Sequence, residues 1–126
     1  MAISQVLCTS FKKELLEGTH DFANDTFKIA LYTSAATLNA DTTVYTTDNE
    51  VSGTGYVAND KALSASTVAS GDGVGFVNFS DATWASSSFT ARGALIYNSS
   101  KSNKAVMVLD FGDNKTSNNS TFTVGM

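Results

Sequence analysis

The chain has 126 residues, of which 42 % are apolar, 16 % are charged and none is proline, and its formal net charge is −4. This length favours a single domain over residues 1–126. The acidic balance and the scarcity of clustered lysine or arginine argue against direct binding to nucleic acid. The sequence has no apolar run of about 18 residues and no charged segment leading into an apolar one. We therefore expect no membrane span, no membrane partner and synthesis in a cytoplasm.

The first predicted element is a helix over residues 4–17, with Ser4 as its N-cap and Gly18 just beyond its C-terminus. One apolar stripe at a spacing of four supports this helix: Ile3, Leu7, Phe11 and Leu15. Leu16 lies off the stripe, which predicts a further apolar contact in the core or on a neighbouring chain. Cys8 is the sole cysteine, so it forms no internal disulfide, and we expect a buried structural thiol within this helix.

A strand is predicted over residues 26–33, where apolar side chains alternate with others. Residues 34–60 follow as a long, polar and irregular loop, with a short edge strand at 43–46. Loops of this length in a compact domain are usually functional or held by partners. We therefore expect an ordered contact arm, and we expect deletion of residues 36–52 to spare the fold.

The signals for β structure strengthen toward the C-terminus. The predicted elements are a weak strand at 61–67, a tight turn at 70–73, a strand through 74–79, a hairpin of 89–98 with 104–112, and a last strand at 120–124 after a polar loop. One helix and five to seven strands predict a mainly β fold. We expect a small antiparallel β-sandwich or barrel over about 26–124, with one N-terminal α-helix.

The residues predict no catalytic, cofactor-binding or metal site. His20 is the only histidine, and without a partner base, nucleophile or ligand set it is expected to cap or pack in a turn. The glycine-rich segments 53–55 and 71–75 lack the pattern of a phosphate-binding loop and are interpreted as turns. A calcium site is the alternative for three acidic loop residues, although their spacing follows no calcium-loop template: Asp41, Asp48 and Glu50.

Two further side chains carry specific expectations. Trp84 precedes a run of serines, and we expect a core aromatic, with an exposed anchor for a sugar or a partner as the alternative. Arg92 lies among apolar residues. Because a lone buried charge is very costly, we expect Arg92 to be paired with a carboxylate or with carbonyl groups.

Four spaced motifs cover nearly the whole chain in a fixed order. They are K-x-A-L-Y/C-T-S at 28–34, N-E-V-x-G-T-G-Y at 49–56, W-x-x-S-x-x-x-A-R-x-A-x-I-Y at 84–97, and D-F-G-x-x-K-x-S at 110–117. In these motifs the chain resembles a family of small virion structural proteins of tailed bacteriophages. The resemblance implies a particle component that is located in the virion and assembled in the host cytoplasm, without enzymatic activity or a cofactor. Its implied partners are the major capsid protein or other virion proteins, and further copies of itself.

Relatives in that family carry one more apolar strand after the segment at 120–124. Either the sequence given lacks a tail, or a sheet edge is left open to a strand from a neighbour.

The leading hypothesis is a capsid decoration, or cement, protein that binds the head surface and stabilises contacts between capsomers. Such a protein would act as an oligomer, because symmetry multiplies weak contacts. The alternative is a β-domain of the tail, neck or fibre, with a host-contact role through aromatic residues: Trp84, Tyr32, Tyr45 and Tyr56. A small hydrolase acting on the host envelope is the remote alternative, and it would need two facing carboxylates. Its candidates are Asp21, Asp25, Asp41, Asp48 and Glu50.

Overall fold

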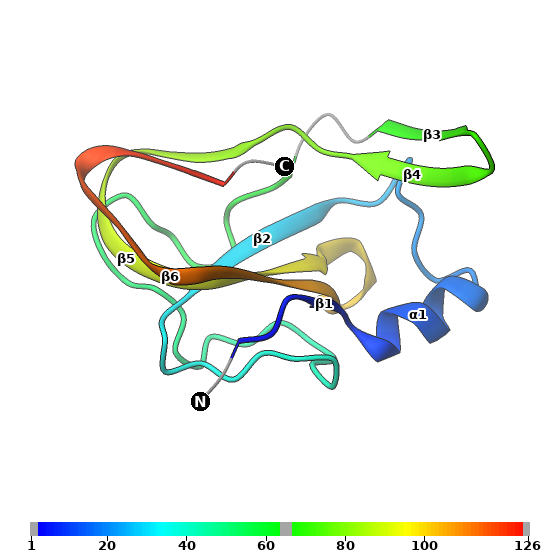
Figure 1. Cartoon of the computed structure of the whole chain (residues 1–126), viewed down its shortest axis with the longest axis horizontal. Coiled ribbons are helices and arrows are strands. Elements are labelled where there is room, and N and C mark those ends of the chain that lie inside the picture. The colour runs from blue at the N-terminus through cyan, green and yellow to red at the C-terminus, as the bar shows by residue number, and fades with distance from the viewer. Residues whose placement is uncertain (1–2, 64–66, 125–126) are drawn as a thin grey trace.

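The computed structural model describes residues 3–63 and 67–124. In chain order its elements are β1 (Val6–Leu7), α1 (Thr9–Leu16), β2 (Phe27–Tyr32), β3 (Thr67–Gly71), β4 (Val74–Asn78), β5 (Ala82–Asn98), a 3-10 turn (Ser99–Lys101) and β6 (Lys104–Val124) (Figure 1). One sheet has the strand order β1-β6-β5-β2 and a second, smaller one consists of β3 and β4, and every strand pair is antiparallel. The prediction of a mainly β fold with one N-terminal helix is confirmed.

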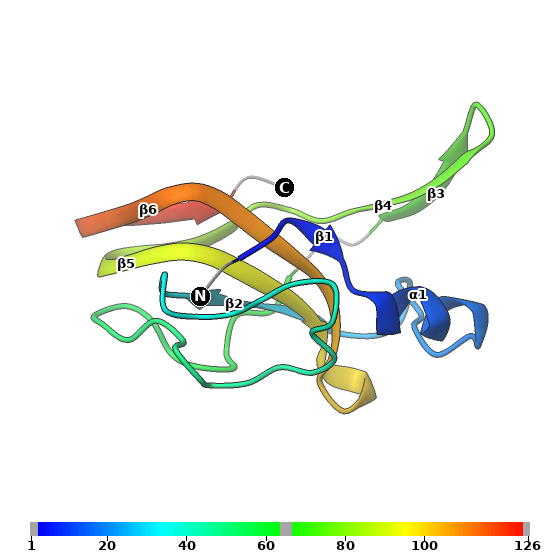
Figure 2. The same ribbon diagram turned by 60° about the horizontal axis from the view of Figure 1, so that its bottom comes forward.

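A long ribbon of β5 and β6 shapes the molecule. The two strands pair from Asn98↔Lys104 beside the turn to Ala82↔Val124 at the far end, with register shifts on the way. Positive φ angles at Ser86 (50°), Gly112 (81°) and Asn119 (50°) accompany these irregularities, and bulges of this kind bend and twist a strand. In Figures 1 and 2 the ribbon bends back, so its far half lies over its near half.

The separate strands predicted at 104–112 and 120–124 are therefore one strand. The polar segment between them was expected to be a loop, but its backbone continues to pair with β5, for example at Lys115 and Asn118. Its side chains gave no strand signal because most of them are exposed at the bend.

The helix begins at Thr9, so the predicted start at residue 4 is wrong. Residues 6 and 7 instead form β1, pairing with Val108 and Met107, and the Cys8 backbone N–H donates to the Val106 carbonyl at 3.0 Å. This pairing satisfies the backbone of the segment in an extended form. Cys8, not Ser4, is the N-cap, and it makes no side-chain capping bond.

The predicted apolar stripe is only partly buried. Phe11 is 4 % exposed, whereas Leu7 and Leu15 are 41 % and 45 % exposed. Leu16 is 92 % exposed, so the expected contact with the core of its own chain is wrong. The helix end is as predicted: Gly18 has φ 75°, and the two N–H groups of Gly18 and Thr19 donate to Leu15 and Glu14 in a Schellman motif.

Strand β2 confirms its prediction, and it is buried on both faces. Residues 61–63 of the predicted strand at 61–67 run beside β2, through a bridge between Ala62 and Lys28; residues 64–66 lie outside the described residues. The predicted turn at 70–73 is confirmed as the tip of the β3–β4 hairpin. Its two central residues, Asp72 and Gly73, have φ 51° and 77°, as in a type I′ turn.

No helix in the described part of the chain has the length and apolar character of a membrane span.

The loop at 34–60 covers the sheet and belongs to the core. Ala36, Leu38 and Val51 are each at most 4 % exposed. Its backbone bonds to distant segments, for example Ser4 N–H to Leu38 O at 2.9 Å and Val51 N–H to Leu31 O at 2.9 Å. The edge strand predicted at 43–46 is reduced to an isolated bridge. Because these residues pack against their own chain, the loop is part of the core, and the structure argues against the expectation that residues 36–52 can be deleted without harm to the fold.

The first testable prediction concerns this loop. Leu38→Ala is expected to lower the free energy of unfolding by about 2–5 kcal/mol, because it leaves a cavity in the core. Deletion of residues 36–52 is expected to abolish the cooperative transition. Urea denaturation followed by circular dichroism measures both, with Val57→Ala as the control because Val57 is 63 % exposed. A deletion variant that unfolds with the wild-type midpoint would contradict the assignment.

Candidate functional site

Four tyrosines fasten the loop at 34–60 to the sheet. Two of their hydroxyls donate to opposite oxygens of one carboxylate: Tyr45 to Glu50 Oε1 at 2.7 Å, and Tyr56 to Glu50 Oε2. The Tyr32 hydroxyl donates to the Thr46 carbonyl at 2.6 Å. The Tyr97 hydroxyl donates to Asn59 Oδ1 at 2.6 Å, and the Tyr45 and Tyr97 rings stack with centroids 4.5 Å apart.

Burial raises the pKa of all four tyrosines well above the ordinary value of 10, and the Glu50 carboxylate raises it further. Every hydroxyl of the group therefore stays protonated and donates at physiological pH. Tyr32 is fully buried and its hydroxyl is engaged within the chain. The alternative in which it contacts a host glycan is therefore wrong, and the hydroxyls of Tyr45 and Tyr56 are also engaged internally.

The second prediction separates two of these tyrosines. Tyr45→Phe is expected to lower the free energy of unfolding by about 1.5 kcal/mol, the contribution of one hydrogen bond to a charged group. Tyr56→Phe is expected to cost about 3 kcal/mol, because the Tyr56 oxygen also accepts the Leu31 backbone N–H at 2.9 Å. Urea denaturation of the matched pair measures the difference. Equal losses would show that the bond to Leu31 contributes nothing.

A second polar network joins the helix, the start of β2 and the end of β5. The Asn98 side-chain amide donates to Asp25 Oδ2 at 2.8 Å and contacts His20 Nδ1 at 2.9 Å, while Asn98 Oδ1 accepts the Ser100 N–H. His20 Nε2 lies 2.8 Å from Glu14 Oε1, so both ring nitrogens have partners within the chain, and the prediction of a histidine that packs beside the turn is confirmed.

Asp25 is the charged end of this network. Burial alone raises its pKa, but hydrogen bonds from Asn98, Lys101 and the Asp21 backbone outweigh burial and hold the pKa at about 2, below the ordinary 3.8. Lys101 Nζ lies 2.9 Å from both carboxylate oxygens. The folded state thus favours ionised Asp25.

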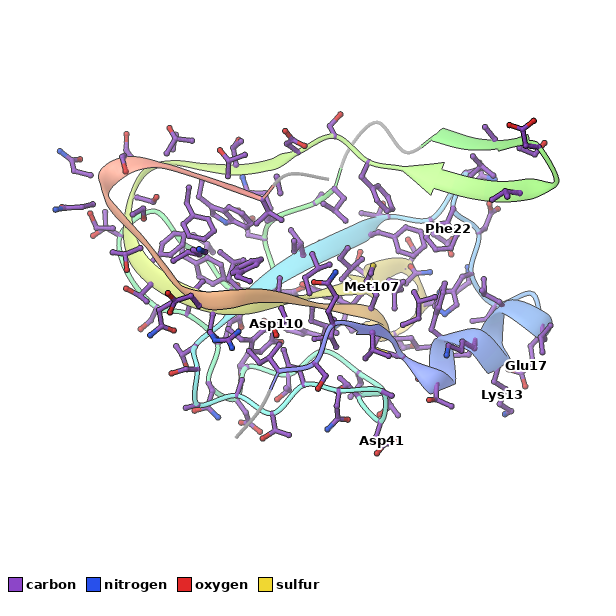
Figure 3. The ribbon with its side chains drawn as sticks, viewed as in Figure 1. Lys13, Glu17, Phe22, Asp41, Met107 and Asp110 are labelled. Atoms are coloured by element: carbon purple, nitrogen blue, oxygen red, sulfur yellow. The ribbon has the colours of Figure 1, made fainter. Side chains whose placement is uncertain are left out.

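The third prediction follows from the direction of that shift. Because the folded-state pKa is the lower one, the stability that Asp25 contributes is present above about pH 4 and is lost as the pH falls toward about 2. Asp25→Asn is expected to reduce stability at pH 6 and to flatten its decline between these values. Urea denaturation across this range measures the effect, with Asp41→Asn as the control at an exposed loop position (Figure 3). The assignment would be overturned if the stability of Asp25→Asn fell over this pH range as steeply as that of the wild type.

The structure also shows the surroundings of the other residues for which the sequence carried an expectation. Arg92 pairs with Asp110, as expected for a cation among apolar neighbours, and the Gly112 backbone N–H and Arg92 together lower the pKa of Asp110. Cys8 is fully buried, which confirms a structural thiol, and burial raises its pKa to about 11. Trp84 is 4 % exposed with Lys61 over its ring, so it is a core aromatic and the exposed-anchor alternative is wrong.

The acidic residues considered for calcium or for hydrolysis serve other contacts. Both Glu50 oxygens accept tyrosine hydroxyls, Asp25 is paired with Lys101, and Asp21 caps the backbone of its own turn. Asp41 and Asp48 are exposed in separate turns of the loop. Within residues 3–63 and 67–124, no group of three or more His, Cys, Asp or Glu side chains is placed to hold a metal ion.

The two strands of the bent ribbon differ in how their outer edges are covered. Beside β5 the Ser88 N–H donates to the Thr54 carbonyl at 2.9 Å. A Cβ at Gly53 would lie 2.6 Å from the Ser88 carbonyl oxygen, and one at Gly55 would lie 2.9 Å from Ser87 Cα. Only glycines allow the chain to approach β5 this closely, so the segment at 53–55 closes that edge.

The outer edge of β6 is open at the corresponding place. Strand β1 pairs with it only at Met107 and Val108, and in the described part of the chain no further strand lies beside residues 111–124. A groove of about 540 Å³ opens here between the two halves of β6. Its apolar lining is Leu109, Phe111, Phe122 and Val124, and polar residues including Gln5, Lys115 and Thr121 complete it.

This edge and groove form the candidate site, which we call the β6 groove. The sequence pointed to an open edge through the resemblance alone. It did not indicate the groove, because the residues that line it are brought together by the bend of the ribbon. Neither a scan against protein-family models nor searches of curated proteins and of solved structures return a match for this chain.

Proposed function

We propose that the protein is a structural component of a tailed-phage virion, and more specifically a capsid decoration protein that binds the head surface. The observation that carries the proposal is the β6 groove, in which unpaired strand edge and apolar surface lie together. Such an edge pairs with an extended segment of another chain, with backbone hydrogen bonds giving affinity and side-chain pockets giving specificity.

The interior supports the same proposal. The tyrosines around Glu50 and the network around Asp25 hold the loop and the sheet in one arrangement. A pre-organised surface loses little conformational entropy on binding. Because a head presents the same site many times, repeated weak contacts by a rigid small domain are multiplied by symmetry. The sequence motifs add the resemblance to virion proteins and the expected partner, the major capsid protein.

The fourth prediction is the copy number in purified particles of a phage whose genome encodes this chain. Quantitative mass spectrometry against the major capsid protein is expected to give a number comparable with that of the capsid protein or of its capsomers. A number typical of a neck, tail or fibre would favour that alternative, and absence from particles would overturn a virion role.

A binding measurement complements the copy number. Heads stripped of the protein are expected to lose resistance to heat and to regain it when the protein is added back. Thr123→Arg is expected to prevent this rescue, because it places a large charged side chain at an exposed position in the lining of the groove. An unchanged urea midpoint checks that the variant folds. Asp41→Asn, on the exposed loop surface, is the matched control and is expected to rescue fully.

A further inference from the structure

The outer edge of β6 continues past the end of β1. In an antiparallel ladder the backbone groups that face one neighbour recur at every second residue. The Val106 carbonyl faces β1, because it accepts the Cys8 N–H. The same edge therefore includes Val108, which β1 still covers, and then Asp110 and Gly112. Strand β1 ends before it reaches these last two residues.

Side chains of the same chain occupy the two backbone donors that β1 leaves uncovered. Gln5 Oε1 accepts the Asp110 N–H at 3.2 Å, and Asp110 Oδ1 accepts the Gly112 N–H at 2.9 Å. The ion pair with Arg92 holds the Asp110 carboxylate in this position (Figure 3). Both bonds are exposed, and Gln5 also lines the β6 groove. The donors are thus occupied by groups that can move without the unfolding of a strand.

From these bonds we infer that Gln5 and Asp110 form a displaceable cap on the edge of β6. In the free protein the cap shields the two donors from unrelated chains, as an exposed strand edge requires. An extended segment of the partner enters the β6 groove in line with β1 and antiparallel to β6. Its carbonyl groups take over the two donors, and the side chains of the cap turn away. The cap therefore competes with the partner and lowers its apparent affinity.

This inference rests on the proposed function, since it describes how the same groove is shielded until the partner binds. The two are tested separately. The cap is measured by hydrogen exchange on the purified protein, whereas binding is measured on particles.

The fifth prediction is the effect of removing the Gln5 acceptor. In Gln5→Ala, amide hydrogen exchange of the purified protein, followed by NMR, is expected to be several times faster at Asp110. Exchange at Val108 is expected to stay unchanged, because β1 still covers this residue. Ser4→Ala is the matched control at the neighbouring exposed position. Equal exchange rates at Asp110 in Gln5→Ala and in the wild type would overturn the inference.

A second measurement tests the competition between cap and partner. Heads stripped of the protein are expected to bind Gln5→Ala about fivefold more tightly than the wild type, because one net hydrogen bond no longer has to be broken. Ser4→Ala is expected to bind as the wild type does. Equal affinities of Gln5→Ala and the wild type would overturn the inference. If none of the three proteins binds to heads, the proposed function fails, and the exchange rates alone then decide whether the cap exists.

Discussion

The antiparallel pairing of β5 with β6, and the bend within it, is the constraint on which the rest of the structure depends. The bend places Trp84 and Phe122 from the far half of the ribbon close to Phe89 and Phe111 from the near half. Their ring centroids lie 4.9 to 6.4 Å apart in successive pairs. Aromatic side chains bury large areas, so this cluster stabilises the bent form.

A ribbon of two strands cannot cover its own apolar surface, and the fold recruits the loop at 34–60 for this task. Tyr56 enters the aromatic cluster with its ring 5.7 Å from that of Phe89, and its hydroxyl reaches Glu50 at the other side of the loop. Leu38 and Val51 complete the cover. An irregular segment is tolerated in such a position only when its polar groups have partners. The tyrosine hydroxyls and the backbone bonds to β2 supply these partners.

The loop leaves the outer edge of β6 uncovered. The segment at 53–55 closes β5 at the bend, and no described segment does the same for β6. Open strand edges are a hazard for a protein that acts alone, because they pair with other chains. For a protein that assembles, the same edge is a site of recognition. The projecting β3–β4 hairpin has the opposite character, since it presents apolar side chains without a surface of its own chain to cover them.

The sequence by itself determined the elements whose signals are local. Alternating apolar residues predicted β2, Asp72 and Gly73 predicted the hairpin turn, Gly18 predicted the end of the helix, and Arg92 among apolar neighbours predicted its ion pair. In each of these cases a side-chain period, a left-handed backbone position or the cost of a buried charge acts within a few residues. The mainly β class followed from the same signals.

Only the tertiary structure decided the start of the helix, the role of the loop and the location of the β6 groove. Pairing of residues 6 and 7 with β6 competed successfully with helix propensity. The local sequence pattern did not show this pairing, because the partner strand lies about a hundred residues away in sequence. The bonds that hold the loop and the turn likewise join distant residues, such as Tyr97 with Asn59 and Asn98 with Asp25. Polar side chains of this kind have no periodic pattern, so their partners are set by how the ribbon bends. The groove arises from that bend as well, since two halves of a single strand form its walls.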